Sequence, residues 1–244
     1  MPILPVLDLL QGHIVRGIAG QRDIYKPIIS RLVSSSEPLA VAEALQQHFG
    51  FTEFYLADLD AIQHGQPNLA VMTQLQHAGF RLWIDAGLQS AHDETLTALL
   101  ALNPAGIVVG LESVAGPEEL RRIGQRAGER VIFSLDLKAG KPLGRVALWD
   151  AVDAENIARQ ALALLPSPRL LVLDLARVGV GGGAGTEELC LRIKRAFPAV
   201  QLTAGGGVRG IDDVRRLYAH GVDYVLVASA LHDGRLTPAE VRQC

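Results

Sequence analysis

Two short stretches of the sequence place an aspartate directly after an apolar residue run and a glycine four residues later. They are LDLLQG at residues 7–12 and LDLKAG at residues 135–140, so the aspartates are Asp8 and Asp136. A carboxyl group can give or take a proton, and two carboxyl groups in different surroundings can divide the acid and base roles. Asp8 and Asp136 can act on one substrate only if the fold brings them to one site.

The elements that position these aspartates are short, near-continuously hydrophobic segments. Such segments recur at residues 3–8, 54–58, 81–85, 106–110, 131–136, 169–174, 200–204 and 223–228. Continuous rather than alternating hydrophobicity is typical of strands that are covered on both faces, as in a parallel sheet with helices outside. Between them lie segments with apolar residues at helical spacing, many of which end near a glycine.

Eight strand signals that alternate with helices in 244 residues predict an α/β protein, a single-domain (β/α)8 TIM barrel over residues 1–244. An open doubly wound sheet is the alternative. It usually carries a glycine-rich dinucleotide turn after its first strand, and LDLLQGHIV has none. The barrel is therefore the preferred interpretation.

The two aspartate stretches belong to a longer internal repeat. The LDLLQG and LDLKAG stretches are 128 residues apart, and AGLQSAHDETLTAL (86–99) resembles GGVRGIDDVRRLYA (206–219) at an offset of 120 residues. GIVVGLES (106–113) resembles YVLVASAL (224–231) at 118 residues, and Asp58 matches Asp174 at 116 residues. Four matches in the same order predict two half-barrels, at about residues 1–125 and 126–244.

A barrel of this kind has its active site where the strands end. Asp8 and Asp136 are then expected on opposite sides of one mouth, supplied by the first and fifth strands. The turns DAGLQ (85–89) and AGGGVR (204–209) open helices, and the free N–H groups of such turns bind anions. Two similar turns beside two carboxyl groups fit a substrate with a phosphate at each end.

Other residues leave alternatives open. Asp58 and Asp174 are evenly balanced between catalysis and the capping of neighbouring loops. The glycine-rich segment 179–185 could cradle an anion or form a mobile loop over the mouth. Lys138 could form a Schiff base, although it lies beyond the strand end, and Trp149 could stack on a substrate ring or pack its loop.

Composition sets the class of protein. The chain is 49% hydrophobic and 20% charged, with a formal net charge of −3 and a pI near 6.2, so no global charge draws it to nucleic acid or anionic membrane. Cys190 and Cys244 show no disulfide or metal spacing, and the seven histidines form no ligand cluster. The first residues resemble neither a secretory signal nor a spanning helix. We expect a soluble cytoplasmic protein with a small-molecule phosphorylated ligand, no nucleic-acid or membrane partner, no metal and no cofactor.

Four features carry a resemblance to a known family. They are ILPVLDLLQGHIVRG (3–17), YLADLDAIQHGQPN (55–68), the order Asp136, Gly140 and Trp149 after the fifth strand, and TAGGGVRGIDDVRRL (203–217). Together they resemble the HisA/HisF family of histidine-biosynthesis barrels, and the sequence is more similar to the HisA branch. The resemblance covers nearly the whole chain.

The resemblance implies a (β/α)8 barrel and a cofactor-free Amadori rearrangement, in which an aldose–ketose isomerase converts an aminoaldose to an aminoketose. Asp8 would be the base at C2, an Asp in the loop after the sixth strand the acid, and Asp136 and a sixth-strand Thr would assist. The implied substrate and phosphate contacts are Gly87 and Gly110 at one end, Gly206, Gly207, Ala228 and Ser229 at the other, and Trp149.

The sequence departs from the family pattern in the sixth strand and its loop. Leu173 stands where the family has its Thr, and Val178 stands where it has the loop Asp, so the usual acid is missing and Asp136 or Asp174 would have to replace it. Glu112 lies where the first phosphate would approach, and its charge would repel a phosphate if the side chain pointed inward. Ser229 and the glycines near it leave the second phosphate site more intact.

Three functions remain in view. The first is the HisA-like isomerase of histidine biosynthesis, and the second is a divergent relative that acts on another phosphorylated substrate in a different pathway. The third is a catalytically silent binder of a phosphorylated ligand. The missing acid favours the second function on chemical grounds, the family resemblance favours the first, and the surviving pair Asp8 and Asp136 disfavours the third.

Overall fold

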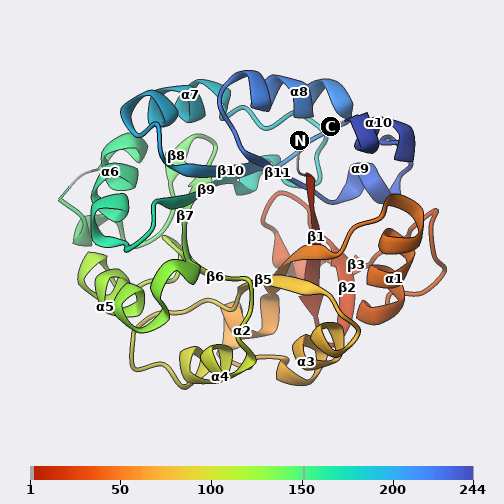
Figure 1. The fold of residues 1–244 in the computed structure, drawn as a ribbon, viewed down its shortest axis with the longest axis horizontal. Coiled ribbons are helices and arrows are strands. Elements are labelled where there is room, and N and C mark those ends of the chain that lie inside the picture. Colours follow the sequence, from red (N-terminus) through yellow and green to blue (C-terminus); the bar gives the residue numbers. More distant parts are fainter. Residues whose placement is uncertain (1–2, 151, 244) are drawn as a thin grey trace.

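A closed barrel of eight parallel strands forms the centre of the protein, as the computed structural model of residues 3–150 and 152–243 shows (Figure 1). Its strands are β1 (Ile3–Leu10), β4 (Glu53–Asp58), β5 (Arg81–Asp85), β6 (Gly106–Gly110), β7 (Val131–Lys138), β9 (Arg169–Asp174), β10 (Gln201–Gly205) and β11 (Tyr224–Val227). β11 pairs with β1, with Leu4 opposite Leu226, and this pairing closes the barrel. The predicted (β/α)8 fold is confirmed.

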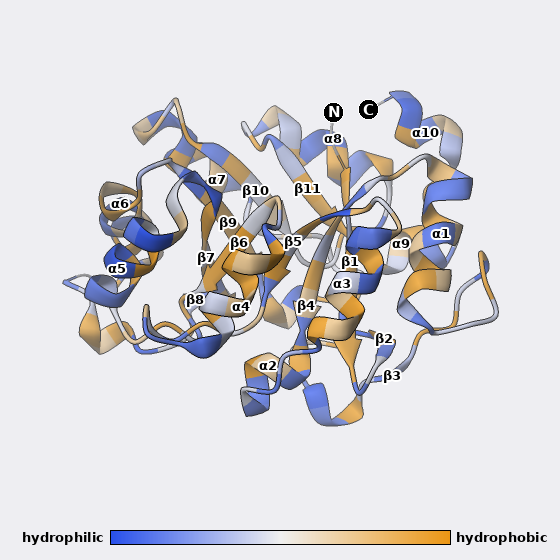
Figure 2. Cartoon of the chain, turned by 60° about the horizontal axis from the view of Figure 1, so that its bottom comes forward, coloured by the Kyte–Doolittle hydropathy of each residue, from blue (hydrophilic) through white to orange (hydrophobic). Residues whose placement is uncertain are grey.

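A ring of helices surrounds the barrel (Figure 1). They are α1 (Pro38–Phe49), α2 (Leu59–His64), α3 (Leu69–His77), α4 (Glu94–Leu102), α5 (Pro117–Ala127), α6 (Ala154–Leu164), α7 (Glu187–Ala196), α8 (Ile211–Ala219), α9 (Ser229–His232) and α10 (Pro238–Gln243). Their apolar faces turn towards the apolar strands and their polar faces outward, as Figure 2 shows. Burying these faces on both sides of the sheet is why the strands are hydrophobic throughout.

The inside of the barrel is filled rather than open. Leu4, Val108, Ile132, Leu171 and Leu226 are among the inward-facing side chains that pack into one buried cluster. At the end where the strands begin, the rings of Trp83 and Tyr224 lie 5.3 Å apart, and the Arg169 guanidinium lies 4.8 Å from the Trp83 ring. The opposite end of the barrel, where the strands end, is called the mouth. The packed side chains close the barrel interior beneath it.

Two hairpins extend the strands that carry the key aspartates. β1 turns back into β2 (His13–Arg16), which pairs with β3 (Lys26–Pro27), and β7 turns back into β8 (Lys141–Pro142). The sequence predicted that the two strands end at Asp8 and Asp136. They continue to Leu10 and Lys138, because the antiparallel partners extend the hydrogen-bonded ladder. The loop between β2 and β3 contains a short 3-10 helix, η1 (Arg22–Ile24), and Gly17, Arg22 and Tyr25 of this loop line the mouth.

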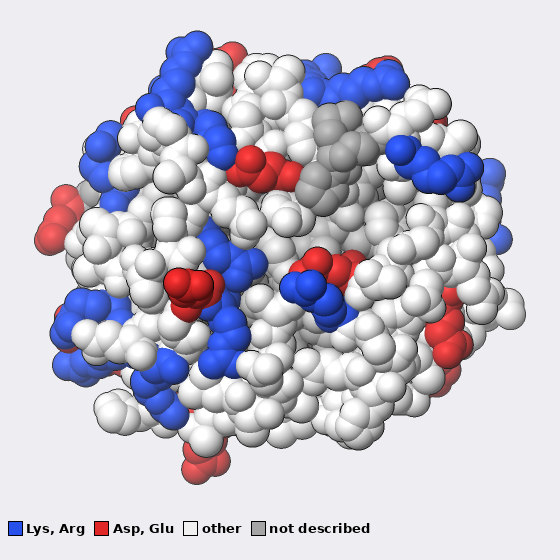
Figure 3. Space-filling view, in the orientation of Figure 1, with Lys and Arg blue, Asp and Glu red and all other residues white. Residues whose placement is uncertain are grey.

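Charge is mixed on the face of the molecule that is viewed in Figure 3. Figure 3 shows lysine and arginine side chains interspersed with aspartate and glutamate on the face turned to the viewer. Within residues 3–150 and 152–243, no helix is long and apolar enough to cross a membrane.

Candidate active site

One cavity opens at the mouth of the barrel, and most of the predicted site residues line it. They are Asp8, Asp136, Gly206, Gly207, Ala228 and Ser229, joined by Tyr25, Tyr55, Asp85, Arg22, Glu112 and His232. The residues come from all parts of the chain, from β1 to α9, because parallel strands deliver their ends to one face. The structure thus brings the two repeated aspartates to a single site.

Asp8 lies in the cavity with no hydrogen-bond donor for its carboxyl group among the described residues. A side-chain carbon on Gly17 would lie 2.9 Å from Asp8 Oδ2, so this position accommodates only hydrogen. Burial raises the pKa of Asp8 to about 7, and the positive charge of Arg22 opposes that rise. A carboxyl group with such a pKa exchanges protons at neutral pH, and its oxygens are free to reach a substrate.

Asp136 is held in place by its neighbours. It accepts hydrogen bonds from Ser134 Oγ at 2.6 Å and from the Glu112 N–H at 3.1 Å, and it is 5% exposed. Burial raises its pKa to about 7, and the charge of Asp85 adds to the rise, whereas these hydrogen bonds lower it. Asp136 therefore also holds a proton for much of the time at neutral pH.

A third carboxyl group, Asp85, was missed in the sequence. It ends β5, accepts a hydrogen bond from the Tyr55 hydroxyl at 3.0 Å, and accepts another from the Gly87 N–H at 3.1 Å. Burial raises the pKa of Asp85 to about 6. The signal was present, because Asp85 closes the apolar segment RLWID just as Asp8 and Asp136 follow theirs. Burial and the nearby aspartates also keep the pKa of Tyr55 well above its usual range.

An ion pair spans the side of the mouth that residues from the first half of the sequence form, called the first-half side below. Arg22, from η1 above β1, donates to both carboxylate oxygens of Glu112, at 3.1 and 2.7 Å. Glu112 follows β6, so the pair ties the loop between β2 and β3 to the end of β6. Such two-pronged pairs are geometrically specific. Glu112 lines the mouth, and Arg22 matches its charge.

The turn after β10 forms the other side of the mouth. Gly206 and Gly207 have φ values of +97° and +75°, and a side-chain carbon on Gly207 would lie 2.6 Å from the Arg177 carbonyl oxygen. Only glycine fits this combination of backbone angle and close approach. The turn lines the cavity together with Ala228 and Ser229, which follow β11.

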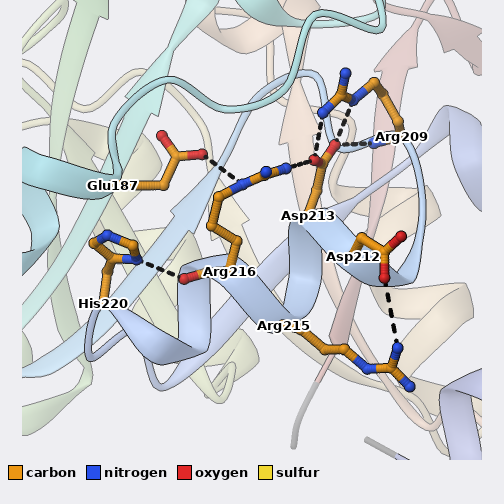
Figure 4. A network of polar contacts seen from close by, with 7 residues as sticks. All are labelled: Glu187, Arg209, Asp212, Asp213, Arg215, Arg216 and His220. Atoms are coloured by element: carbon orange, nitrogen blue, oxygen red, sulfur yellow. Dashed lines mark hydrogen bonds and ion pairs between the residues drawn. The ribbon is translucent and has the colours of Figure 1, made fainter.

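A network of charges fixes the end of this turn, as Figure 4 shows. The Arg209 N–H, Nε and Nη2 all donate to Asp213 of α8, at 2.9, 2.8 and 2.7 Å, and Arg216 contacts the same carboxylate. The hydrogen bonds from Arg209 lower the pKa of Asp213 to about 2. Asp213 thus stays ionised and anchors the turn to α8 over a wide pH range.

The loop after β9 forms part of the cavity lining. The Ala19 N–H donates to the Val178 carbonyl oxygen at 2.7 Å, and the Gly183 N–H donates to the Gly207 carbonyl oxygen at 3.1 Å. Val178 and Leu173 line the cavity with apolar side chains. The position that the resemblance equates with the family's acid is therefore inside the site, and an apolar group occupies it.

The remaining predicted residues lie outside the cavity lining. Asp174 is buried, and its carboxylate accepts from the N–H groups of Ala139, Gly140 and Ala176 at 3.0, 2.8 and 3.0 Å, which is a capping arrangement. Trp149 is buried with its ring 5.3 Å from that of Phe133, on the helix side of the barrel.

Gly87 and Gly110, the predicted contacts of the first phosphate, also lie beside the cavity rather than in its lining. A side-chain carbon on Gly87 would lie 2.6 Å from the Cα atom of Ile62, and one on Gly110 would lie 2.7 Å from Asp136 Oδ2. Both glycines therefore allow close packing. In the part of the chain that the structure describes, no group of three His, Cys, Asp or Glu side chains is placed to hold a metal ion.

Comparison with known proteins identifies the family. The family model described as "Histidine biosynthesis protein" matches residues 2–237. The chain belongs to this family. The resemblance seen in the sequence is thereby confirmed, over almost the full length.

Individual relatives cover the same length. An uncharacterized protein of Methanocaldococcus jannaschii is 30% identical over 99% of this chain and 97% of its own. A protein of Moorella thermoacetica is 30% identical over 98% of this chain and 96% of its own, and one of Chloroflexus aggregans is 28% identical over 97% and 94%. The last two are named as imidazole-4-carboxamide isomerases, and the substrate in their names carries two phosphoribosyl groups.

Proposed function

We propose that the chain is a cofactor-free isomerase that converts a phosphorylated aminoaldose to an aminoketose, an Amadori-type rearrangement. The observation that carries the proposal is the pair Asp8 and Asp136, two carboxyl groups in one cavity whose pKa values are both raised to about 7. Membership in a family whose named relatives are isomerases supports the same reaction class.

The differing surroundings of the two carboxyl groups give them different roles. Asp136 acts as the acid that protonates the ring oxygen of the sugar, so the ring opens to a protonated Schiff base at C1. Asp8, whose oxygens are free, then removes the proton from C2 and leaves an enolamine. Asp8 returns its proton to C1, and the C2 hydroxyl gives up its proton to Asp136, so that the C2 ketone of the aminoketose forms. Asp136 thus regains the proton that it gave to the ring oxygen, Asp8 is again a carboxylate, and no atom is lost.

The turn after β10 holds the phosphate during these steps. The N–H groups at Gly207 and Ser229 supply donors that need no basic side chain. The loop from Leu175 to Gly183 lies above the bound sugar and limits the access of water to the enolamine. These features position the substrate and protect it, and the carboxyl groups transfer the protons.

The reaction can be tested with the glycosylamine that forms between ribose 5-phosphate and a primary amine. We expect the protein to accelerate its conversion to the aminoketose, followed by NMR, without any added metal or cofactor. Binding of ribose 5-phosphate with no acceleration over buffer would contradict the isomerase proposal and favour a silent binder.

A second candidate is the isomerase step of histidine biosynthesis itself, and the relatives' names favour it. Rescue of a histidine auxotroph that lacks this isomerase would establish it. Leu173 and Val178, which replace the two polar residues of the family pattern, favour a different phosphorylated substrate. On this ground we expect no rescue by the folded protein.

A further inference from the structure

The two sides of the mouth differ in the backbone N–H groups that they leave available to an anion. In the turn after β5, the Gly87 N–H donates to Asp85 Oδ1 at 3.1 Å. The internal repeat pairs Gly87 with Gly207, and within the described residues no acceptor lies opposite the Gly207 N–H. The donor that could bind a phosphate is therefore occupied in the first half-barrel and free in the second.

The next turn repeats this difference. The Leu111 N–H donates to the Ser134 carbonyl oxygen at 2.9 Å, and the Glu112 N–H donates to Asp136 Oδ2 at 3.1 Å. The repeat pairs Leu111 with Ser229, whose N–H has no acceptor in the described part of the chain. In both first-half turns, these N–H groups thus already donate to acceptors within the protein.

Charge also separates the two sides. Asp85 ends β5, whereas the residue that the repeat pairs with it, at the end of β10, is Gly205. Beside Asp85 lie Glu112, which is already paired with Arg22, and the carboxyl groups of Asp8 and Asp136. A second phosphate placed here would meet more negative than positive charge.

On the second-half side, His232 of α9 lines the cavity and is only 1% exposed. Its Nδ1 lies 3.0 Å from Ser30 Oγ, and its buried Nε2 has no partner in the described part of the chain. Ser30 Oγ also accepts a hydrogen bond from the Leu32 N–H, and its hydroxyl can either donate to Nδ1 or accept from it. Burial lowers the pKa of His232 to about 4, which leaves the ring neutral. An unpartnered ring nitrogen at this depth calls for a polar ligand atom beside it.

We propose that the substrate carries a single phosphate, bound by Gly207, Ser229 and His232, and an amino group at its other end, bound by Asp85. This inference rests on the proposed function and narrows its substrate class. Asp85 accepts the hydrogen of the amine, and Tyr55 orients the carboxylate from the other side. The substrate differs in this respect from the one named for the relatives, which carries two phosphoribosyl groups.

Binding of four simple phosphates tests the inference, measured by calorimetry on the whole chain. Glucosamine 6-phosphate and glucose 6-phosphate differ by one amino group, and fructose 1,6-bisphosphate and fructose 6-phosphate differ by one phosphate. We expect the aminosugar to bind about tenfold more tightly than glucose 6-phosphate, the effect of one charge-assisted hydrogen bond. The bisphosphate should bind no more tightly than the monophosphate.

Two variants test whether Asp85 causes the preference for the amino group. Asp85→Asn should remove the preference for the amino group and retain phosphate binding. Asp212→Asn, on the exposed face of α8, removes a carboxylate that is 89% exposed and should keep the preference. Tighter binding of the bisphosphate, or equal binding of the two hexose 6-phosphates, would overturn the inference alone. Failure of inorganic phosphate and of all four sugars to bind would instead contradict the phosphate site, and with it the proposed function.

Discussion

Asp8 and Asp136 line the same cavity, and within the described residues only Asp136 is held by hydrogen bonds, from Ser134 and Glu112. The free carboxyl group of Asp8 suits a base that must approach carbon, since its oxygens are not committed to protein donors. The fixed group of Asp136 suits an acid that must meet a particular oxygen. The difference in hydrogen bonding thus distinguishes two residues that the predicted repeat places at equivalent positions.

The raised pKa of Asp8 predicts that this residue destabilises the fold at high pH. Its pKa is about 7 in the folded chain and near 3.8 in the unfolded chain, so the folded state binds more protons between these values. The contribution of Asp8 to the free energy of unfolding therefore falls as pH rises from about 4 to about 7. Asp8→Asn should be more stable than the natural protein at pH 8, by about 1 kcal/mol.

Urea denaturation at pH 5 and pH 8 measures this effect. The advantage of Asp8→Asn should be larger at pH 8 than at pH 5, because the substitution breaks no hydrogen bond and removes only the buried charge. The matched control Asp212→Asn should show no such pH-dependent gain. A loss of stability for Asp8→Asn at pH 8 would show that Asp8 has a stabilising partner.

The phosphate turn predicts a specific loss for Gly207→Ala. A methyl group there would lie 2.6 Å from the Arg177 carbonyl oxygen, so the turn must move. We expect phosphate affinity to fall at least tenfold. Gly50→Ala is the matched control, because Gly50 has a similar φ of +85° with open space around it. Both variants should lose about 1 kcal/mol of stability from the backbone angle, and only Gly207→Ala should lose phosphate. Equal phosphate affinity in both would contradict the assignment of the turn.

The ion pair between Arg22 and Glu112 predicts a gain of function. Glu112→Gln removes one negative charge from the first-half side and leaves Arg22 without its ion-pair partner. We expect fructose 1,6-bisphosphate to bind this variant more tightly than it binds the natural protein, with fructose 6-phosphate unchanged. Arg22→Gln should produce no such gain. Unchanged bisphosphate affinity in Glu112→Gln would show that Asp85 alone excludes the second phosphate.

The sequence predicted the barrel and the paired aspartates because both depend on regular patterns. Continuous apolar segments identified the strands, and the repeat related Asp8 to Asp136. The sequence did not reveal that β1 and β7 continue as hairpins, since pairing with β2 and β8 depends on contacts that form only after the chain turns back.

Distinguishing a catalytic aspartate from a capping one also required the structure. Asp174 ends an apolar strand just as Asp85 does, but loop N–H groups bind its carboxylate. Asp85 faces the cavity, and sequence position alone does not separate the two. The partnership between Arg22 and Glu112, 90 residues apart, likewise depends on how loops meet above the barrel.

The central claim is that Asp8 removes the C2 proton of a phosphorylated aminosugar, and solvent deuterium tests it most directly. The glycosylamine of ribose 5-phosphate is incubated in D2O with the protein, and the aminoketose is examined by proton NMR. The account predicts aminoketose that has lost the C2 proton and carries deuterium at C1. It further predicts a rate at least 100-fold lower for Asp8→Asn, a loss within the usual size of general-base catalysis. Equal rates for Asp8→Asn and the natural protein would contradict the account.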